Sequence, residues 1–503
     1  MIAMTRRQLG WGAGASAIAL ATGATPSWGN TAPGSDATVD AAPLPPPDDL
    51  THAVKRTSFG PLRQELELVQ EIGWPSYLER QLAPETIDDS AVEATVAAAY
   101  PLINASVEEM AALPPEGRLQ VGLQLTAATL HRGAFSRRQL FEVMVDFWSN
   151  HFSIYLNDGP VRILKVVDDR EVIRRHALGN FADLLHASAK SPAMLYYLDN
   201  HTNVASGPNE NYARELMELH TLGEDGGYDQ RDVEEVARCF TGWTVDLRDG
   251  SFVFANRRHD QGEKWVLGQP IAANGGIADG EQVLDLLARH PSTAQTVARK
   301  LCQRFIQEAP AQATVDTVAA AFAQSGGDIP AVLRTLFSQP DFFRATDAKF
   351  RRPMDFLLAT LRTTEVAATT DWRVALQFLQ RSGQLPFQWP APNGYPDTVG
   401  YWANSNGLLN RWNYALALGR GQLPGAALPI DAWVEGVRTP LELVAVLAER
   451  LLQRPLADAD AWALVHYAAD GGAPDRPLPR ASLVVKARGL VGLLLASPYF
   501  HHY

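Results

Sequence analysis

Apolar residues recur at three- and four-residue spacing along most of the chain, and this period predicts α-helices. The pattern starts at residues 61–82 ("PLRQELELVQEIGWPSYLERQL") and returns at 137–152, 169–191, 290–306, 314–327, 329–343, 351–365, 439–453 and 483–500. Because the period extends over nearly the whole chain, the sequence predicts a mainly α, multi-helical globular protein.

One clear β pattern interrupts the helices, at residues 243–255 ("WTVDLRDGSFVFA"). Apolar residues alternate on both sides of Asp249-Gly250, which predicts a hairpin with a two-residue turn and a positive φ at the glycine. The next segment, "KWVLGQPI" at residues 264–271, is a candidate third strand. The helical domain is therefore expected to carry a small β-hairpin insert at about 243–271.

Two helices end in similar ways, "LRTLFSQPDFF" at 333–343 and "VGLLLASPYFHH" at 491–502. In each, a proline and an aromatic residue close an amphipathic helix. The segment 51–503 is therefore either a pair of helical lobes that meet near residue 345, or one domain in which the residues that stop helices alone make the two helix ends similar.

The N-terminal residues 1–29 resemble a twin-arginine export signal, because Arg6-Arg7 precedes an uncharged run rich in Gly, Ala, Leu and Ile. Residues 30–50 are rich in Pro and Ala and are expected to form a flexible spacer. We expect the twin-arginine translocation machinery to export the chain to the periplasm or the extracellular space. No later run reaches the roughly 18 apolar residues of a membrane span, so no transmembrane anchor is expected after cleavage.

The composition limits the classes of partner that the chain is expected to bind. The chain has 503 residues, a net charge of −12 and no basic run, which disfavours binding to nucleic acid. Its two cysteines, Cys239 and Cys302, lie in apolar helical patterns and fit either a disulfide or two buried free thiols. Two cysteines are too few for a thiolate metal cluster.

The densest polar motif is "NENYARELMELHTLGEDGGYDQRD" at 209–232. Helical spacing places one set of residues on a single polar stripe and His220 on the apolar side; the stripe comprises Asn211, Arg214, Glu215, Glu218 and Thr221. One hypothesis makes this stripe a solvent face with an Arg214–Glu218 ion pair. The other makes it line a cleft, where Arg214, Glu215 and Glu218 are candidate catalytic residues. Farther on, Asp229 is expected to cap the next helix, with Asp232 at its third position.

Histidines supply the other candidates. His151 and His220 each lie on the apolar face of a helix, so they are expected to meet in one pocket, either as hydrogen-bonded core residues or as metal ligands. His259-Asp260, after the hairpin, fits a catalytic or metal site, or else a turn in which Lys264 neutralises Asp260. Known zinc-hydrolase, serine-hydrolase, phosphate-loop and dinucleotide motifs are missing, so the sequence names no cofactor.

Several long segments together resemble the bacterial domain-of-unknown-function family 1800. They are "RTSFGP" (56–61), "FWSNHFSI" (147–154), residues 170–200, residues 208–243, "HDQGEKWVLG" (259–268) and "LPFQWPAPNGYPD" (385–397), with Tyr395 where the family often has Trp. The resemblance implies a helical, commonly exported protein. It also implies a gene neighbour that resembles alkaline phosphatases and sulfatases. It assigns no catalytic residue.

Two functions follow as hypotheses. The first is an exported cell-envelope accessory or binding protein that acts with the phosphatase- or sulfatase-like partner. The alternative is a periplasmic hydrolase, with or without a metal, whose cleft gathers the acidic and histidine candidates. The discriminating feature is convergence, because an enzyme needs these side chains within reach of one substrate.

Overall fold

The computed structural model describes residues 44–503, so the expected export signal and most of the expected spacer lie outside the described residues. The chain divides into two compact units. Unit 1 contains residues 44–73, Thr346–Gly383 and Thr398–Tyr503, and unit 2 contains Trp74–Ala345 and Gln384–Asp397. The units are described separately below.

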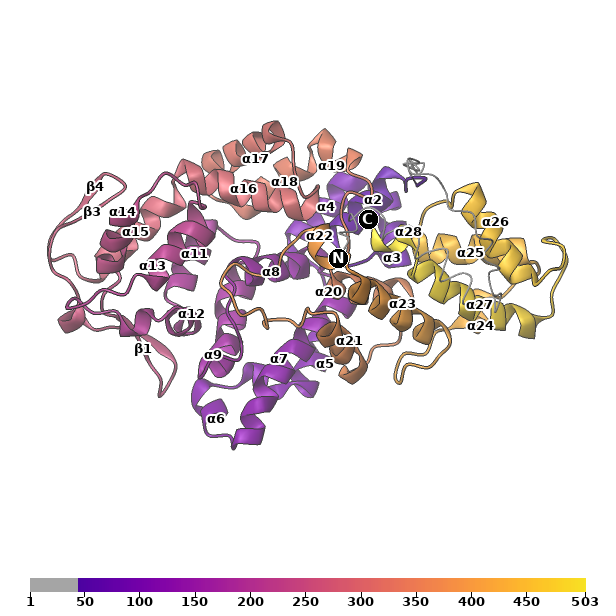
Figure 1. The fold of residues 1–503 in the computed structure, drawn as a ribbon, viewed down its shortest axis with the longest axis horizontal. Helices are drawn as coiled ribbons and strands as arrows, with labels where there is room; N and C mark the ends of the chain where they lie inside the picture. The colour runs from indigo at the N-terminus through magenta and orange to yellow at the C-terminus, as the bar shows by residue number, and fades with distance from the viewer. Residues whose placement is uncertain (1–43) are drawn as a thin grey trace, which may run out of the picture. The chain divides into compact units, whose positions relative to one another are not determined.

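Unit 2 holds all of the candidate residues and is shown in violet to salmon in Figure 1. Its helices α16, α17 and α18 pack against one another in chain order, and α14 packs on α13, α15 and strand β3. The elements of unit 2 are α4 (Trp74–Leu82), α5 (Ser90–Ala99), α6 (Val107–Ala111), α7 (Pro115–Phe135), α8 (Gln139–His151), α9 (Val161–Asp168), the π-helix η3 (Asp169–Ile173), α10 (Arg174–His176), α11 (Phe181–Ala189), α12 (Pro192–Tyr197), α13 (Asn211–Glu215), the π-helix η5 (Leu216–Thr221), α14 (Gln230–Cys239), β1 (Trp243–Asp246), β2 (Ser251–Phe254), β3 (Lys264–Val266), β4 (Gln269–Ile271), α15 (Ile277–Ala288), α16 (Pro291–Phe305), α17 (Gln312–Ser325), α18 (Ile329–Phe337) and α19 (Pro340–Arg344).

Unit 1 is helical in its described part, and α23, α25 and α27 form its central packing. Its helices are α2 (Asp49–Thr57), α3 (Arg63–Ile72), α20 (Pro353–Thr363), α21 (Arg373–Arg381), α22 (Val399–Trp402), α23 (Ser405–Gly419), α24 (Ile430–Trp433), α25 (Pro440–Leu452), α26 (Asp458–Ala469), α27 (Arg480–Leu495) and α28 (Pro498–His501).

The predicted fold class is confirmed: the protein is mainly α with two small antiparallel sheets. Four predicted helices are divided in the structure, at residues 61–82, 169–191, 329–343 and 483–500. Residues 61–82 form α3 and α4, which separate at Gly73 with a φ of +78°. This is a conformation that favours glycine and ends a helix. Residues 169–191 likewise divide before Asn180, whose side chain caps α11.

The β insert differs from the prediction in two ways. Strands β1 and β2 pair from Trp243↔Phe254 to Asp246↔Ser251, so a four-residue loop joins them instead of the two-residue Asp249-Gly250 turn. Gly250 does have a positive φ, +67°. The 264–271 segment adds no third strand to this sheet; it forms its own hairpin, β3–β4, around Leu267 and Gly268, both with positive φ.

Both cysteines are buried free thiols, which settles the alternatives left open by the sequence. Burial raises the pKa of Cys239 and of Cys302 to about 12, so neither thiol is a ready nucleophile at neutral pH. Within residues 44–503, no helix has the length and apolar character needed to cross a membrane.

Candidate functional site

The 209–222 motif forms a helix that changes type halfway along. After α13, residues 216–221 form the π-helix η5, in which Leu222 N donates to Met217 O at 2.8 Å, five residues back. Gly223, with a φ of +86°, follows this helix, and Asp229 and Asp232 form the predicted capping box of α14. Wide π-turns are rare and occur most often at functional positions.

The π-turn alters the predicted polar stripe. Thr221 is not on the stripe but fully buried, and its Oγ1 donates to Leu216 O at 2.7 Å. Arg214 pairs with Glu210 at 3.0 Å rather than with Glu218, and it also donates to Gln230 at 2.8 Å. The extra residue per turn explains the change, because it rotates later side chains away from their α-helical positions.

Glu215 and Glu218 remain together on the partly exposed face of this helix. Burial raises the pKa of the Glu215 carboxyl, the neighbouring Glu218 raises it further, and Arg214 opposes the shift. Tyr197 lies in the same electrostatic neighbourhood: burial raises its pKa, and Glu215 adds to the rise. The three candidate residues Arg214, Glu215 and Glu218 therefore share one surface.

The segment 384–397 is fastened to α8 near this surface. Asn150 Nδ2 donates to Tyr395 O at 3.0 Å, and Tyr395 N donates to Asn150 Oδ1 at 2.7 Å. A Cβ at Gly394 would approach Asn150 O to 2.2 Å, so glycine is required there. Tyr197 donates to Pro390 O at 2.7 Å. These contacts give the "SNHF" and "PNGYPD" segments a packing role.

His151 and His220 do meet, as their apolar faces predicted. Their ring centroids lie 6.1 Å apart, both side chains are buried, and His151 Nε2 is 3.0 Å from His220 O. Lys300 of α16 completes what we call the lysine–histidine cluster: its Nζ donates to Leu219 O at 2.8 Å and lies 3.1 Å from His151 Nδ1.

Hydrogen bonding assigns the protons in this cluster. A carbonyl oxygen only accepts, so His151 Nε2 carries the proton that goes to His220 O, and His151 Nδ1 accepts from the Lys300 ammonium. Burial, followed by repulsion from Lys300, lowers the pKa of His151 well below its usual value and that of His220 to about 3. Burial also lowers the pKa of Lys300 to about 8. The two imidazoles are thus neutral at pH 7.

The candidate metal ligands His151 and His220 have no third partner of the usual kind. Nowhere in residues 44–503 do three or more His, Cys, Asp or Glu side chains gather in a way that would hold a metal ion. The neighbour that the structure does supply, Lys300, is a cation, and it repels a second positive charge. His151 is thus a hydrogen-bonded core residue, whereas His220 contributes its backbone carbonyl and its ring Nε2 has no partner among the described residues.

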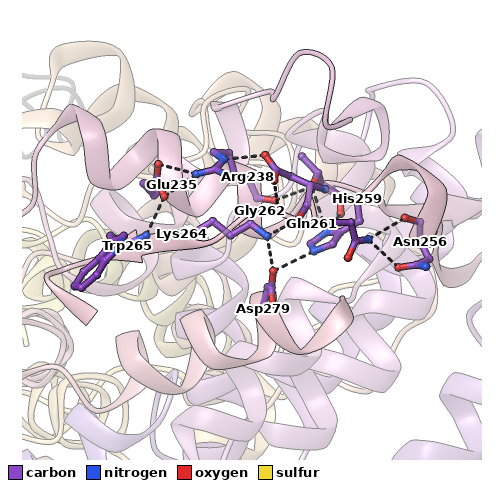
Figure 2. Close-up of polar contacts among 11 residues, drawn as sticks. Glu235, Arg238, Asn256, His259, Gln261, Gly262, Lys264, Trp265 and Asp279 are labelled. Atoms are coloured by element: carbon purple, nitrogen blue, oxygen red, sulfur yellow. Dashed lines mark hydrogen bonds and ion pairs between the residues drawn. The ribbon is translucent and has the colours of Figure 1, made fainter. Parts of the chain in front are cut away.

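His259 lies in a second, fully buried group, the ion-pair cluster of His259, Lys264 and Asp279 (Figure 2). Asp279 Oδ2 lies 2.5 Å from Lys264 Nζ and 3.1 Å from His259 Nε2. The other ring nitrogen, Nδ1, is 2.8 Å from the carbonyl of Thr241 and must donate to it. His259 therefore donates at both nitrogens when Asp279 is ionised.

Asp260 has a different partner from the one expected. Its carboxylate pairs with Arg238 at 2.8 Å and accepts from Gly262 N at 2.8 Å, and the Arg238 hydrogen bond is the main cause that lowers the pKa of Asp260. Lys264 contacts only the backbone carbonyl of Asp260 and neutralises Asp279 instead. The other side of Arg238 pairs with Glu235 at 2.9 Å.

Sequence reasoning missed the residues that complete both clusters. Lys300 lies in α16, more than 75 residues from the histidine that it contacts, and Asp279 lies in α15, about 20 residues from its histidine. Both helices are ordinary amphipathic helices by sequence. A glycine is the one local sign of the position of Asp279. A Cβ at Gly275 would lie 1.9 Å from Asp279 Oδ1, so residue 275 must lack a side chain.

The candidates form three groups rather than one. In the described chain, no hydrogen bond or ion pair joins Glu215 or Glu218 to His259, Asp260, His151 or His220. His259 and Asp260 are fully engaged by Asp279 and Arg238, while the two glutamates lie on an open face. The predicted catalytic and metal-ligating residues are therefore held by three separate sets of contacts.

Fold and site together describe a mainly helical protein whose candidate histidines lie in two buried clusters and whose candidate glutamates lie on a π-helix. A family model described as "Protein of unknown function (DUF1800)" matches residues 52–502, and the chain belongs to this family. Comparison with curated proteins and with solved structures gives no match.

Proposed function

We propose that this protein is an exported cell-envelope accessory or binding protein that acts with a phosphatase- or sulfatase-like partner. The observation that carries the proposal is the dispersal of the candidate chemistry. His259 and Asp260 hold two loops and helices together through ion pairs, and His151 and His220 support a helical core. Residues used in this way are not available to act together on one substrate.

The association is tested with the purified chain and the phosphatase-like protein encoded beside it. The two should co-elute in size-exclusion chromatography and give a measurable Kd by calorimetry. A chain with a surface change away from any expected interface, such as Arg289→Glu at the exposed end of α15, serves as the control. Independent elution at concentrations of about 100 µM would remove the accessory function, since interfaces of standard size bind more tightly than this.

Export is the second part of the proposal, and Arg6-Arg7 supports it. Changing both residues to Lys should hold the precursor in the cytoplasm, because the twin-arginine pair is the recognised feature of such signals. Fractionation followed by immunoblotting measures the result. An unchanged periplasmic yield in the double variant would contradict the proposed route.

One observation favours a second candidate, a hydrolase centred on Glu215. The raised pKa of this carboxyl beside Glu218 is the type of perturbation that general acids show. Glu215→Gln and Glu218→Gln keep the shape of the side chains and remove the charge. If either change abolishes hydrolysis of phosphate or sulfate esters by the purified chain while its Tm is unaltered, the enzyme function replaces the accessory function.

A further inference from the structure

An apolar groove lies in unit 2, away from the residues discussed so far. It has a volume of about 630 Å³, and its walls come from α6, α7, α9 and the loop between β1 and β2. Val107, Leu119, Ile163 and Leu164 are among the lining residues. Most of the lining is aliphatic, so the groove presents a surface that water covers poorly.

Leucines on the rim of the groove are unusually exposed. Leu119 is 53% exposed and Leu247 is 48% exposed. Leu123, one helical turn beyond Leu119 on α7, is also 48% exposed, so the apolar stripe continues past the groove. Three large aliphatic side chains at one place form a patch, and such patches on folded proteins mark interaction sites more often than single exposed leucines do.

The hairpin loop that carries Leu247 is held in place. A Cβ at Gly250 would lie 2.5 Å from Val107 Cγ2 of α6, so the loop packs directly on that helix. Gly250 N donates to Asp246 O at 2.8 Å, and the φ of Gly250 is +67°. The loop is therefore a fixed wall of the groove. Its close packing and positive φ explain why a glycine is needed at this turn.

Two arginines supply all of the charge on the lining. Arg118 donates through Nε to Leu113 O at 3.0 Å, and Arg162 donates through Nη2 to Asn157 Oδ1 at 2.9 Å. Neither guanidinium has a carboxylate partner within the described chain, so each keeps donors for an outside acceptor. An occupant with carboxylates beside an apolar face would complement both the shape and the charge.

We propose that this groove binds a short amphipathic helix of a partner protein, with leucine-like side chains in the groove and carboxylates toward Arg118 and Arg162. The proposal rests on the accessory function above and names its docking surface. Leu119 and Leu123, at i and i+4 on α7, present an apolar stripe of the kind that packs against another helix. A groove this open leaves much of a small ligand in water, whereas a helix would cover the leucines as well.

The test uses a synthetic fluorescent peptide, a 16-residue helix with leucines at helical spacing and glutamates on both edges. A matched peptide has lysine in place of each glutamate. Fluorescence anisotropy with the purified chain should show binding of the acidic peptide and at least tenfold weaker binding of the basic one. The double variant Arg118→Glu/Arg162→Glu should reverse this preference.

Two further variants separate charge from apolar contact. Leu119→Ser/Leu123→Ser changes only exposed positions, so the fold should persist, and it should weaken binding of the acidic peptide by about tenfold or more. Arg231→Glu/Arg289→Glu makes the same charge change at exposed positions on α14 and after α15, and it should alter the affinity less than about twofold.

The proposal is overturned if the acidic peptide does not bind at about 1 mM, if both peptides bind equally, or if the reversed-charge variant keeps the wild-type preference. Binding of phosphatidylglycerol vesicles or of decanoate through the same leucines, without peptide binding, would also overturn it in favour of a lipid site. The accessory function fails separately: a phosphatase-like partner that binds wild type and Leu119→Ser/Leu123→Ser equally leaves that function intact and moves its surface elsewhere.

Discussion

The lysine–histidine cluster and the ion-pair cluster use the same residue types and reach different electrostatic states. Each buries a histidine and brings a lysine Nζ close to it or to its partner. In the ion-pair cluster, Asp279 lies between Lys264 and His259 and compensates both. In the lysine–histidine cluster, Lys300 has only His151 Nδ1 and a carbonyl as acceptors.

The difference shows what a single carboxylate does in a core. Without one, both histidines stay neutral, and the pKa of the Lys300 ammonium falls to about 8. With the carboxylate of Asp279 present, the side chains of His259, which is hydrogen-bonded at both ring nitrogens, and of Lys264 are both 0% exposed. A buried histidine is thus compatible with either state, and the partner that a helix places beside it decides which is present.

The largest effect is expected from Asp279→Asn. This change leaves Lys264 and His259 buried without their counter-charge, so it should lower the free energy of unfolding by about 3–5 kcal/mol. Asp285→Asn is the matched control on the same helix. Asp285 also pairs with a histidine, His186 at 3.0 Å, but its side chain is 54% exposed, so its loss should be below about 1 kcal/mol. Urea unfolding measures both, and equal small losses would show that the buried carboxylate is not needed.

The second effect is a pH dependence specific to the lysine–histidine cluster. The folded-state pKa of His220 is about 3 against 6.5 for the ordinary residue, so between these values the unfolded chain binds more protons than the folded chain. Stability should therefore fall as the pH drops through this window, by about 1.4 kcal/mol per pH unit for His220. The burial of His151 acts in the same direction.

This slope is isolated by comparing wild type with His220→Leu in urea at pH 7, 6 and 5. Carboxylates elsewhere titrate equally in both chains, so the difference between the two curves reports the histidine. The curve of the variant should be the flatter one. Parallel curves would mean that His220 accepts a proton in the folded core as readily as in the unfolded chain, which would contradict its assignment as a neutral buried group.

The smallest effect is expected from Lys300→Met. Lys300 has no carboxylate partner in its cluster, so replacing it should change the free energy of unfolding at pH 7 by less than about 1 kcal/mol and can increase it. Lys264→Met is the matched change in the ion-pair cluster and should cost about 3 kcal/mol or more, because Asp279 then loses its closest cation.

A pH scan adds a second measurement for Lys300. Its folded-state pKa is about 8 against 10.5 for the ordinary residue, so the unfolded chain holds the extra proton between these values. Lys300 should therefore make the free energy of unfolding of the wild type rise between pH 8 and 10.5, and Lys300→Met should lack this rise. If the two chains show the same change over this range, Lys300 is more solvated than the structure indicates.

Local patterns in the sequence were enough for the helical fold class, the capping of α14 by Asp229 and the burial of His151 and His220. All of these depend on residue spacing within one element, and a helix expresses that spacing wherever it packs. The β insert was located correctly, but its turn length and its division into two hairpins were not, because register depends on the pairing of strands and not on the turn residues alone.

Only the tertiary structure decided the partners. The π-turn at Leu216–Thr221 moved Thr221 into the core, and no α-helical period can anticipate an extra residue in a turn. Asp279 and Lys300 come from α15 and α16, so their contacts with His259 and His151 arise from helix packing over long stretches of chain. The sequence alone determined that His151 and His220 are buried, but not that Thr221 is. The charge state of each buried histidine was decided by what another helix placed beside it.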